Sequence, residues 1–279
     1  MTKFKAAIFD WAGTTVNFGS FAPMGVFIKA MAQFGVDITI AQARAPMGAA
    51  KWDHIQALLQ MPEVAAQWVD KYGKAPSDAD VDAIFKVFVP MNEIVAAEYA
   101  DLIPGTIETI ADLRGRGMKI GSTTGYTRSI MQNVLPVAAA QGYSPDNLVC
   151  SDDLIEGRPG PLGIYKCMID LAVYPPAAIL KIDDTAPGIA EGASAGCVTV
   201  GLALSGNAVG KTQEELALMS ESEIATLRGH ATQLLKDAGA DHVVIPPFLT
   251  GCIRRTYAAI FSFIAGVMPP MPMLGRSLL

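Results

Sequence analysis

The sequence has 279 residues, of which 51% are apolar and 17% are charged, and its formal net charge is −6. Such a chain can bury a large core as one large domain or two smaller ones, and its composition is the opposite of a disordered chain's. The acidic balance argues against a nucleic-acid-binding protein, which needs a basic face, but it allows a small anionic ligand beside local cations.

The four cysteines, at positions 150, 167, 197 and 252, form no Cys-x-x-Cys pair. This spacing predicts neither a zinc site nor a disulfide framework, so we expect a reducing, cytoplasmic environment. The first apolar run is broken at Asp10, too early for a signal peptide. The most apolar late segment, Tyr257 to Met268, is too short to cross a bilayer, so we expect a core helix there, a frayed tail from Pro269 to Leu279, and no membrane partner.

In the first third of the chain, the pattern of apolar residues changes from strand-like to helical after a single predicted strand. Residues Phe4 to Phe9 form an apolar run that predicts a buried parallel strand with Asp10 at its carboxyl end. Residues 21–99 instead carry helical periodicity, and loops at Pro46-Met47-Gly48 and from Gly73 to Ser77 divide them into several helices.

This change predicts two domains. We interpret residues 21–99 as a helical cap domain inserted into a core domain that is formed by residues 1–20 and 100–279. An active site between two domains needs closure to exclude water. We expect the hinges near Asn17 to Phe21 and near Tyr99 to Leu102.

Helices and short apolar runs alternate in the second half of the chain. In order, these are a helix from Thr106 to Arg116, a strand from Met118 to Ser122, the apolar pair Leu148-Val149, a helix from Gly163 to Leu171, and strands from Ile179 to Ile182 and Val198 to Val200. Strands that alternate with helices predict an α/β protein with a doubly wound, Rossmann-like parallel sheet. Ligands of such sheets bind outside the carboxyl ends of the strands.

Polar residues meet at this edge of the predicted sheet. Asp10, Thr124 and Asp183-Asp184 stand at strand ends, and Arg158 lies in a loop between two of them. Carboxylates, a hydroxyl and a cation suit a magnesium ion and a phosphoryl group, because Mg²⁺ prefers hard oxygen ligands and a carboxylate can attack phosphorus. Each residue alone is more often an ordinary turn or surface residue, so their common placement is what indicates a site.

Four motifs in this order resemble those of the haloacid dehalogenase superfamily: D-W-A-G-T-T, S-T-T-G-Y-T, G-R-P and K-I-D-D-T. The resemblance runs from residue 4 to about residue 200 and implies a Mg²⁺-dependent hydrolase. It implies that Asp10 is the nucleophile and a metal ligand, with the Ala12 carbonyl and Asp184 as further ligands. We expect Asp183 to lie behind them, and we leave open which of the two aspartates binds the metal directly.

The same motifs imply the phosphate contacts. On the resemblance, Thr124 and Gly125 bind the phosphate and Arg158 neutralises it. Phosphatases of the superfamily usually carry a second aspartate two positions after the nucleophile, as general acid for the departing alkoxide. Ala12 stands at that position here, which suggests a leaving group that is not an alkoxide.

The string P-M-G-A-A-K-W-D-H, from Pro46 to His54, resembles the cap signature of the phosphonoacetaldehyde hydrolase family, as does F-G-S-F-A-P after the nucleophile. The resemblance implies cleavage of a carbon–phosphorus bond, giving acetaldehyde and phosphate. It implies that Lys51 forms a Schiff base with the substrate aldehyde, so that a protonated imine accepts the electrons of the broken bond. Burial beneath the cap would lower the Lys51 pKa, as this role requires.

Further expectations follow from the same resemblance. Met47 and Gly48 are expected to pack near the aldehyde, and either His54 or Tyr126 to relay protons. The partner is a small-molecule phosphonate, and a homodimer through the caps is implied. Two departures from relatives are that Ser20 stands where some have cysteine, and Gly188 where some have an acidic residue that supports the metal.

Three alternatives remain. A phosphatase or phosphomutase of the same superfamily is disfavoured by Ala12. A non-catalytic binding protein is disfavoured because the candidate nucleophile, lysine, arginine and metal ligand occur together. The stretch from Ser205 to Thr212 nearly spells a nucleotide-binding P-loop, but Ser205 stands where the pattern requires glycine. We therefore expect a surface loop there, ahead of an acidic helix from Gln213 to Met219, and no nucleotide.

Overall fold

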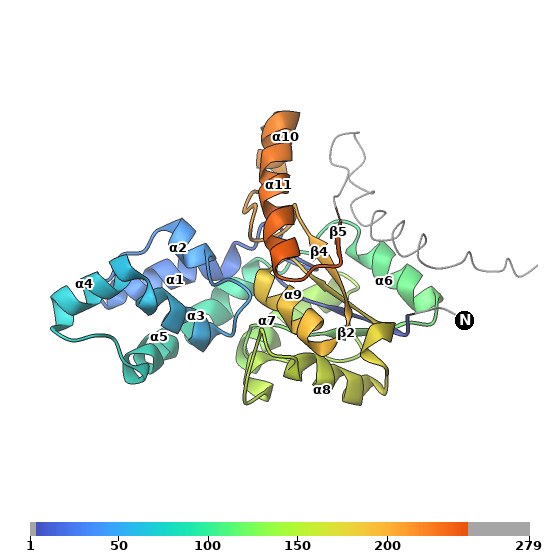
Figure 1. Ribbon diagram of the computed structural model, residues 1–279, viewed down its shortest axis with the longest axis horizontal. Coiled ribbons are helices and arrows are strands. Elements are labelled where there is room, and N and C mark those ends of the chain that lie inside the picture. Colours follow the sequence, from blue (N-terminus) through green and yellow to red (C-terminus); the bar gives the residue numbers. More distant parts are fainter. Residues whose placement is uncertain (1–3, 245–279) are drawn as a thin grey trace, which may run out of the picture.

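Five short strands form the central sheet of the computed structural model, which describes residues 4–244 (Figure 1). They are β1 (Ala6–Phe9), β2 (Lys119–Ser122), β3 (Ile179–Asp183), β4 (Val198–Leu202) and β5 (His242–Val244). All pair in parallel, in the order β2-β1-β3-β4-β5. The connection changes direction between β1 and β3, so the carboxyl ends of these two strands open the crevice where such sheets bind ligands. The predicted α/β class with a parallel, doubly wound sheet is confirmed.

Alternate side chains along the strands pack against helices on opposite faces of the sheet. Helices α6 (Thr106–Gly115) and α7 (Arg128–Ala140) bury one face. Helices α8 (Leu162–Leu171) and α9 (Ala186–Ala195) bury the other. The two-residue period of the strands thus gives each face its own apolar core.

The remaining elements of the core lie around this sheet. The short turns η1 (Ser151–Asp153) and η2 (Pro176–Ala178) lead into α8 and β3, and α10 (Gln213–Leu218) and α11 (Glu221–Asp237) connect β4 to β5. Helix α11 packs against α9 and β4. Both α10 and α11 begin with a capping box, in which a threonine or serine and a glutamate satisfy the first backbone groups reciprocally.

Five helices between β1 and α6 form a bundle at one side of the sheet (Figure 1). They are α1 (Ala22–Gln33), α2 (Ile40–Arg44), α3 (Lys51–Gln60), α4 (Pro62–Tyr72) and α5 (Asp78–Glu98). Their apolar faces, including Phe27, Trp68 and Phe88, bury one another in a cluster separate from the sheet's core. We therefore propose that residues 21–99, here called the insert, form a domain of their own, with residues 1–20 and 100–279 as the core domain.

The segment that joins β1 to the insert has an uncommon backbone. Asn17, Gly19 and Ser20 have φ of 56°, 83° and 54°. Positive φ costs free energy at residues other than glycine and is found where the surrounding structure fixes the chain. The Asn17 amide donates to the Asp101 carbonyl at 3.1 Å, so the two segments that we expect to act as hinges lie against each other.

Three expectations need correction or lie outside the described chain. The pair Leu148-Val149 forms no strand, because Val149 makes only an isolated bridge to Thr123. The stretch from Ser205 to Thr212 is a partly buried loop rather than a surface loop, since Ser205 and Val209 are 2% and 8% exposed. The expected helix from Tyr257 to Met268 and the tail after it fall outside the described residues. Within residues 4–244, no helix is long and apolar enough to cross a membrane.

Candidate active site

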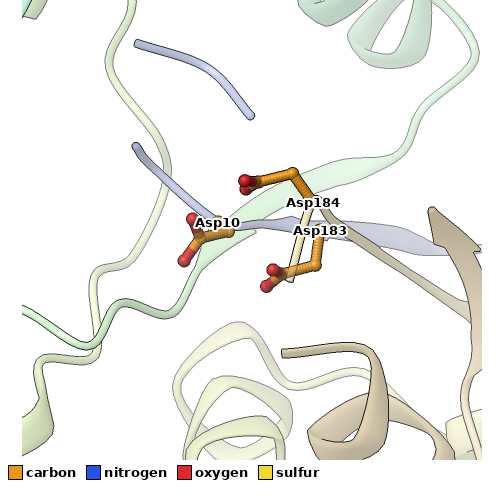
Figure 2. A group of neighbouring side chains, drawn as sticks. All are labelled: Asp10, Asp183 and Asp184. Atoms are coloured by element: carbon orange, nitrogen blue, oxygen red, sulfur yellow. The ribbon is translucent and has the colours of Figure 1, made fainter. Parts of the chain in front are cut away.

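Three aspartates meet where β1 and β3 end. Asp10 directly follows β1, Asp183 is the last residue of β3, and Asp184 follows it. One carboxylate oxygen from each lies within 4.8 Å of the others, and all three residues are buried. Figure 2 shows their side chains at the ends of the neighbouring strands. The parallel register, which aligns Phe9 with Ile182, brings these carboxylates together, as the sequence predicts.

The electrostatics of this cluster favour a cation. Burial, followed by the charge of Asp183, raises the pKa of Asp10 to about 6. Burial and the charges of Asp10 and Asp183 raise the pKa of Asp184 well above its usual range. Among residues 4–244, Asp184 makes no ion pair. A buried set of hard oxygen donors with excess negative charge can bind a divalent metal ion.

Neighbouring polar groups fix the orientation of each carboxylate. The Thr14 hydroxyl donates to Asp184 Oδ1 and the Asn207 amide to Asp184 Oδ2, each at 2.9 Å. The Thr185 amide and hydroxyl donate to Asp183 Oδ1, at 2.9 and 2.7 Å. Thr14 and Thr185 lie in the quoted motifs without having been assigned a role, and Asn207 becomes apparent only when the loops are folded together.

Arg158 connects the nucleophile candidate to a buried charge network. Its Nη1 atom lies 2.9 Å from Asp10 Oδ1 and 3.4 Å from Asp183 Oδ2, and its Nε atom lies 3.0 Å from Glu191 Oε2. Burial would lower the Arg158 pKa, but the charges of Glu191, Asp183 and Asp10 outweigh it and raise the pKa. The guanidinium is therefore a fixed positive charge beside Asp10, as expected for a group that binds phosphate.

Sequence reasoning missed the other half of this network. Lys181 Nζ lies 2.9 Å from Asp183 Oδ2 and 3.2 Å from Glu191 Oε2. The Thr123 hydroxyl donates to Glu191 at 2.8 Å and accepts from Arg158 and Lys181 at 2.7 and 2.8 Å. Lys181 is fully buried although it lies in the middle of β3. A lysine inside a predicted buried strand was the signal that could have revealed the network.

Lys51 reaches the same site from the insert. It is the first residue of α3 and is 3% exposed, with Nζ 5.2 Å from the centre of the Tyr126 ring and 5.8 Å from that of Phe27. Burial is the main cause that lowers its pKa to about 8, with the charge of Asp10 acting against it and the charge of Arg158 acting with it. The positive end of the α3 dipole acts in the same direction as burial. A substantial fraction of the amine is therefore neutral near pH 8.

A small cavity joins the two parts of the site. It has about 20 Å³ of space that a water molecule can occupy, which is roughly one water. Nine of the predicted site residues line it: Asp10, Ala12, Met47, Gly48, Lys51, Thr124, Gly125, Tyr126 and Arg158. Ser20, Pro23 and Thr185 complete the lining. Pro23 and Thr185 end two of the quoted motifs, but neither was predicted as a site residue.

The insert is closed over this cavity. Gly48, with φ of 96°, lies so close to the core that a Cβ atom there would be 2.3 Å from the Thr185 hydroxyl oxygen. Its carbonyl accepts from Arg158 Nη1 at 3.4 Å. Only glycine permits both this backbone conformation and this close approach. A ligand larger than one water molecule does not fit this cavity as it stands.

Two predicted site residues do not line this cavity. Asp184 lies beside it and lines a neighbouring cavity of about 450 Å³ between α2 and α11. His54 is fully buried inside the insert, stacked on Phe27 at 3.8 Å, with its Nε2 atom 3.0 Å from the Ala43 carbonyl. Burial and the Lys51 charge lower the His54 pKa well below its usual range. His54 is therefore neutral, and it lies in α3 three residues after Lys51.

Tyr126 keeps its proton. Burial and the charges of Asp10 and Asp184 raise its pKa above the usual value for tyrosine. Its ring faces Lys51, and its carbonyl accepts from the Ser151 amide at 3.0 Å. A neutral phenol can donate a hydrogen bond but does not act as a base at ordinary pH.

Comparison with known proteins agrees with the motifs. The family model of haloacid dehalogenase-like hydrolases matches residues 4–196. A phosphonoacetaldehyde hydrolase from Paraburkholderia xenovorans is 51% identical over 244 residues, which cover 88% of this chain and 91% of that protein. One from Salmonella typhi is 48% identical over 246 residues, with the same coverage of 88% and 91%.

The fold comparison gives the same result. A crystal structure of a phosphonoacetaldehyde hydrolase-like protein from Oleispira antarctica superposes with a TM-score of 0.89 at 37% identity. The match covers 95% of this chain and 92% of that one. From the family model, the relatives and the shared fold, this chain belongs to the haloacid dehalogenase-like hydrolases, within the family of the phosphonoacetaldehyde hydrolases.

Proposed function

We propose that the protein hydrolyses the carbon–phosphorus bond of phosphonoacetaldehyde to acetaldehyde and phosphate. The activity of its relatives supports this substrate. The observation that carries the proposal is that Lys51, with a pKa of about 8, shares one cavity with Asp10 and Arg158. An amine for the aldehyde and a carboxylate with a cation for the phosphonate are the two functions that this substrate needs.

We assign the metal of this reaction as Mg²⁺. Asp10, Asp184 and the Ala12 carbonyl would hold it, because Asp184 is buried beside Asp10 and Asp183 and forms no ion pair with a cation of residues 4–244. Asp183 is assigned to the network instead, since Lys181 and Arg158 already pair with it. Bound Mg²⁺ would supply positive charge for the phosphoryl oxygens.

The covalent steps begin at Lys51. Its neutral amine adds to the aldehyde carbon, and the resulting carbinolamine takes up one proton and loses water to give a protonated imine. An Asp10 oxygen then attacks phosphorus, and the carbon–phosphorus bond breaks. Its electron pair forms the carbon–carbon double bond of an enamine, while the nitrogen becomes neutral. Arg158 and Thr124 are assigned to bind the phosphonate oxygens during this transfer.

Two hydrolyses complete the cycle. The enamine takes a proton on carbon and becomes an imine of acetaldehyde, which water hydrolyses to acetaldehyde and free Lys51. A second water hydrolyses the aspartyl-phosphate to phosphate and the Asp10 carboxylate. Tyr126 faces Lys51 and retains its proton, so we assign it as the hydrogen-bond donor for proton transfers at the imine. His54, inside the insert, is assigned to position Lys51.

The phosphatase alternative lacks a proton donor at the expected position. Ala12 lines the cavity two residues after Asp10, and its methyl group cannot protonate an alkoxide. An enamine leaving group does not need that proton at the moment of bond cleavage. Met47 and Gly48, which line the cavity beside Lys51, are assigned to enclose the two-carbon aldehyde, and Gly125 to approach the phosphonate.

Two wider assignments belong to the proposal. A homodimer is proposed on the family resemblance. The cytoplasm is proposed as the location because Cys150, Cys167 and Cys197 are free thiols, which suit a reducing compartment.

The test is product release by the wild type and two variants. With phosphonoacetaldehyde and Mg²⁺, the wild type should release acetaldehyde and phosphate in equal amounts. Lys51→Arg keeps the charge but cannot form the imine, and Asp10→Ala removes the nucleophile, so both should release neither product. An inert wild type, or an active Lys51→Arg, would refute the Schiff-base mechanism.

A further inference from the structure

Arg44 makes the most extensive polar contact between the insert and the segment after β4. It is the last residue of α2, and its Nη1 atom lies 3.0 Å from the Gly19 carbonyl in the expected hinge. The same atom lies 3.1 Å from the Asn207 carbonyl and 3.0 Å from Asn207 Oδ1. In return, Asn207 Nδ2 donates to the Arg44 carbonyl at 3.0 Å. Arg44 and Asn207 therefore hold each other reciprocally.

The other side of Asn207 contacts the proposed metal site. Its backbone amide donates to Asp184 Oδ2 at 2.9 Å. Ser205, two residues earlier, donates from its hydroxyl to the Gly13 carbonyl at 2.8 Å, and its backbone carbonyl accepts from the Gly19 amide at 2.8 Å. The stretch that resembles a P-loop is thus a partly buried strap that touches the insert, the hinge and Asp184.

We propose that Arg44 and Asn207 are positioning residues that couple closure of the insert to the placement of Asp184 for metal binding. Arg44 moves with the insert and Asp184 belongs to the core, so the Arg44–Asn207 contact exists only when the insert is closed. Closure then fixes the Asn207 amide against Asp184 Oδ2. This inference rests on the proposed function only in taking Asp184 as a metal ligand.

Thermodynamic linkage makes this coupling reciprocal. If closure improves the placement of Asp184, then the metal ion must favour closure by the same factor. The metal would bind more weakly to a protein whose insert closes less often, because its apparent affinity falls with the closed fraction. The effect of the Arg44–Asn207 contact can therefore be measured through metal affinity, without any substrate.

The test must separate geometry from charge. Asp184 is among the charges that act on Arg44, so removing the Arg44 charge would by itself strengthen metal binding. Arg44→Lys keeps the charge, but the lysine side chain ends short of the position of Nη1, the one atom that reaches Gly19 and Asn207 together. Asn207→Ala is neutral and keeps the backbone amide that binds Asp184. Arg114→Lys on α6, where Arg114 contacts the Ser144 carbonyl and Asp146, is the matched control.

The measurement is the Kd of Mg²⁺ by calorimetry on the full chain without substrate, for these variants and for Arg44→Lys/Asn207→Ala. Arg44→Lys and Asn207→Ala should each raise Kd by roughly fivefold or more, and the double variant by no more than the larger single effect. Arg114→Lys should leave Kd unchanged. The thermal midpoint, measured alongside, shows whether a variant is folded, and a purely structural role would lower the midpoint without moving Kd.

Each contrary outcome is informative. Unchanged Kd in Arg44→Lys, multiplied effects in the double variant, or a wild type that binds no Mg²⁺ would overturn the coupling. Turnover of phosphonoacetaldehyde by the wild type tests the proposed function separately. A wild type that releases phosphate while the variants bind Mg²⁺ normally would remove this inference alone. An inert wild type with coupled changes in Kd would remove the proposed substrate alone.

Discussion

At the scale of single residues, the site depends on side chains whose charge is set by burial. Lys51 has no carboxylate partner at ion-pair distance among residues 4–244, and its pKa falls to about 8. Arg158 has three carboxylates around it and stays charged. Because Lys51 can become neutral and Arg158 cannot, the amine suits covalent chemistry and the guanidinium suits anion binding.

The Lys51 pKa predicts a pH dependence. Only the neutral amine adds to an aldehyde, so kcat/KM should fall about tenfold for each pH unit below the pKa of about 8 and level off above it. The pH profile of kcat/KM in the wild type measures this. A limb that continues to rise to the ordinary lysine pKa of about 10.4 would contradict the account of burial.

The close approach of Asp183 leaves no room for a side chain at position 188. A Cβ atom at position 188 would lie 1.9 Å from Asp183 Oδ2, so Asp183 or α9 would have to move. Gly188→Ala should therefore lower the free energy of unfolding by about 1–3 kcal/mol, the usual cost of overpacking, as measured by urea denaturation.

A glycine in an open position provides the control. No atom lies within 4 Å of a Cβ placed on Gly229, inside α11. Gly229→Ala should raise the free energy of unfolding by about 0.5–1 kcal/mol, because alanine favours the helix. A gain of stability in Gly188→Ala, like the gain expected for Gly229→Ala, would show that the close contact with Asp183 does not exclude a side chain at position 188.

At the scale of elements, β3 and α9 together build the support for Arg158. Lys181 projects from β3 towards α9, where Glu191 accepts from it and from Arg158. Glu191 is 2% exposed, so its charge is stable only with these partners. The strand supplies the cation and the helix supplies the anion, which fixes the distance between the two elements.

Removing Glu191 should therefore be costly. Glu191→Ala leaves two buried cations with fewer partners and should lower the free energy of unfolding by about 3–5 kcal/mol, measured by urea denaturation. Lys166→Ala breaks an exposed pair with Asp170 on α8 and should change stability by no more than about 0.5 kcal/mol. Equal effects of the two substitutions would show that the buried network adds no stability.

At the scale of the whole molecule, the insert and the core carry different halves of the proposed chemistry. The insert provides Lys51, and the sheet edge provides Asp10, Arg158 and Asp184. The cavity between them has room for about one water molecule, so the proposed function requires the substrate to enter while the insert is displaced from the core.

The sequence was sufficient for the parts of this arrangement that follow from period and topology. Asp10 and Asp183 end apolar runs, and parallel strands align such ends at one edge. Lys181 and Glu191 could not be paired in advance, because their contact depends on how α9 packs on β3. The strap at Asn207 was misjudged because its polar composition is typical of exposed loops, while its amide and side chain are satisfied inside the protein.

The central claim is that Lys51 forms an imine with the substrate before Asp10 attacks phosphorus. Borohydride reduction in the presence of phosphonoacetaldehyde, followed by peptide mass spectrometry, tests it most directly. The wild type should carry an ethyl group on Lys51, because the phosphoryl group has left, whereas Asp10→Ala should carry a 2-phosphonoethyl group there. Unmodified Lys51 in both proteins, or the same label on Lys51→Arg, would contradict the account.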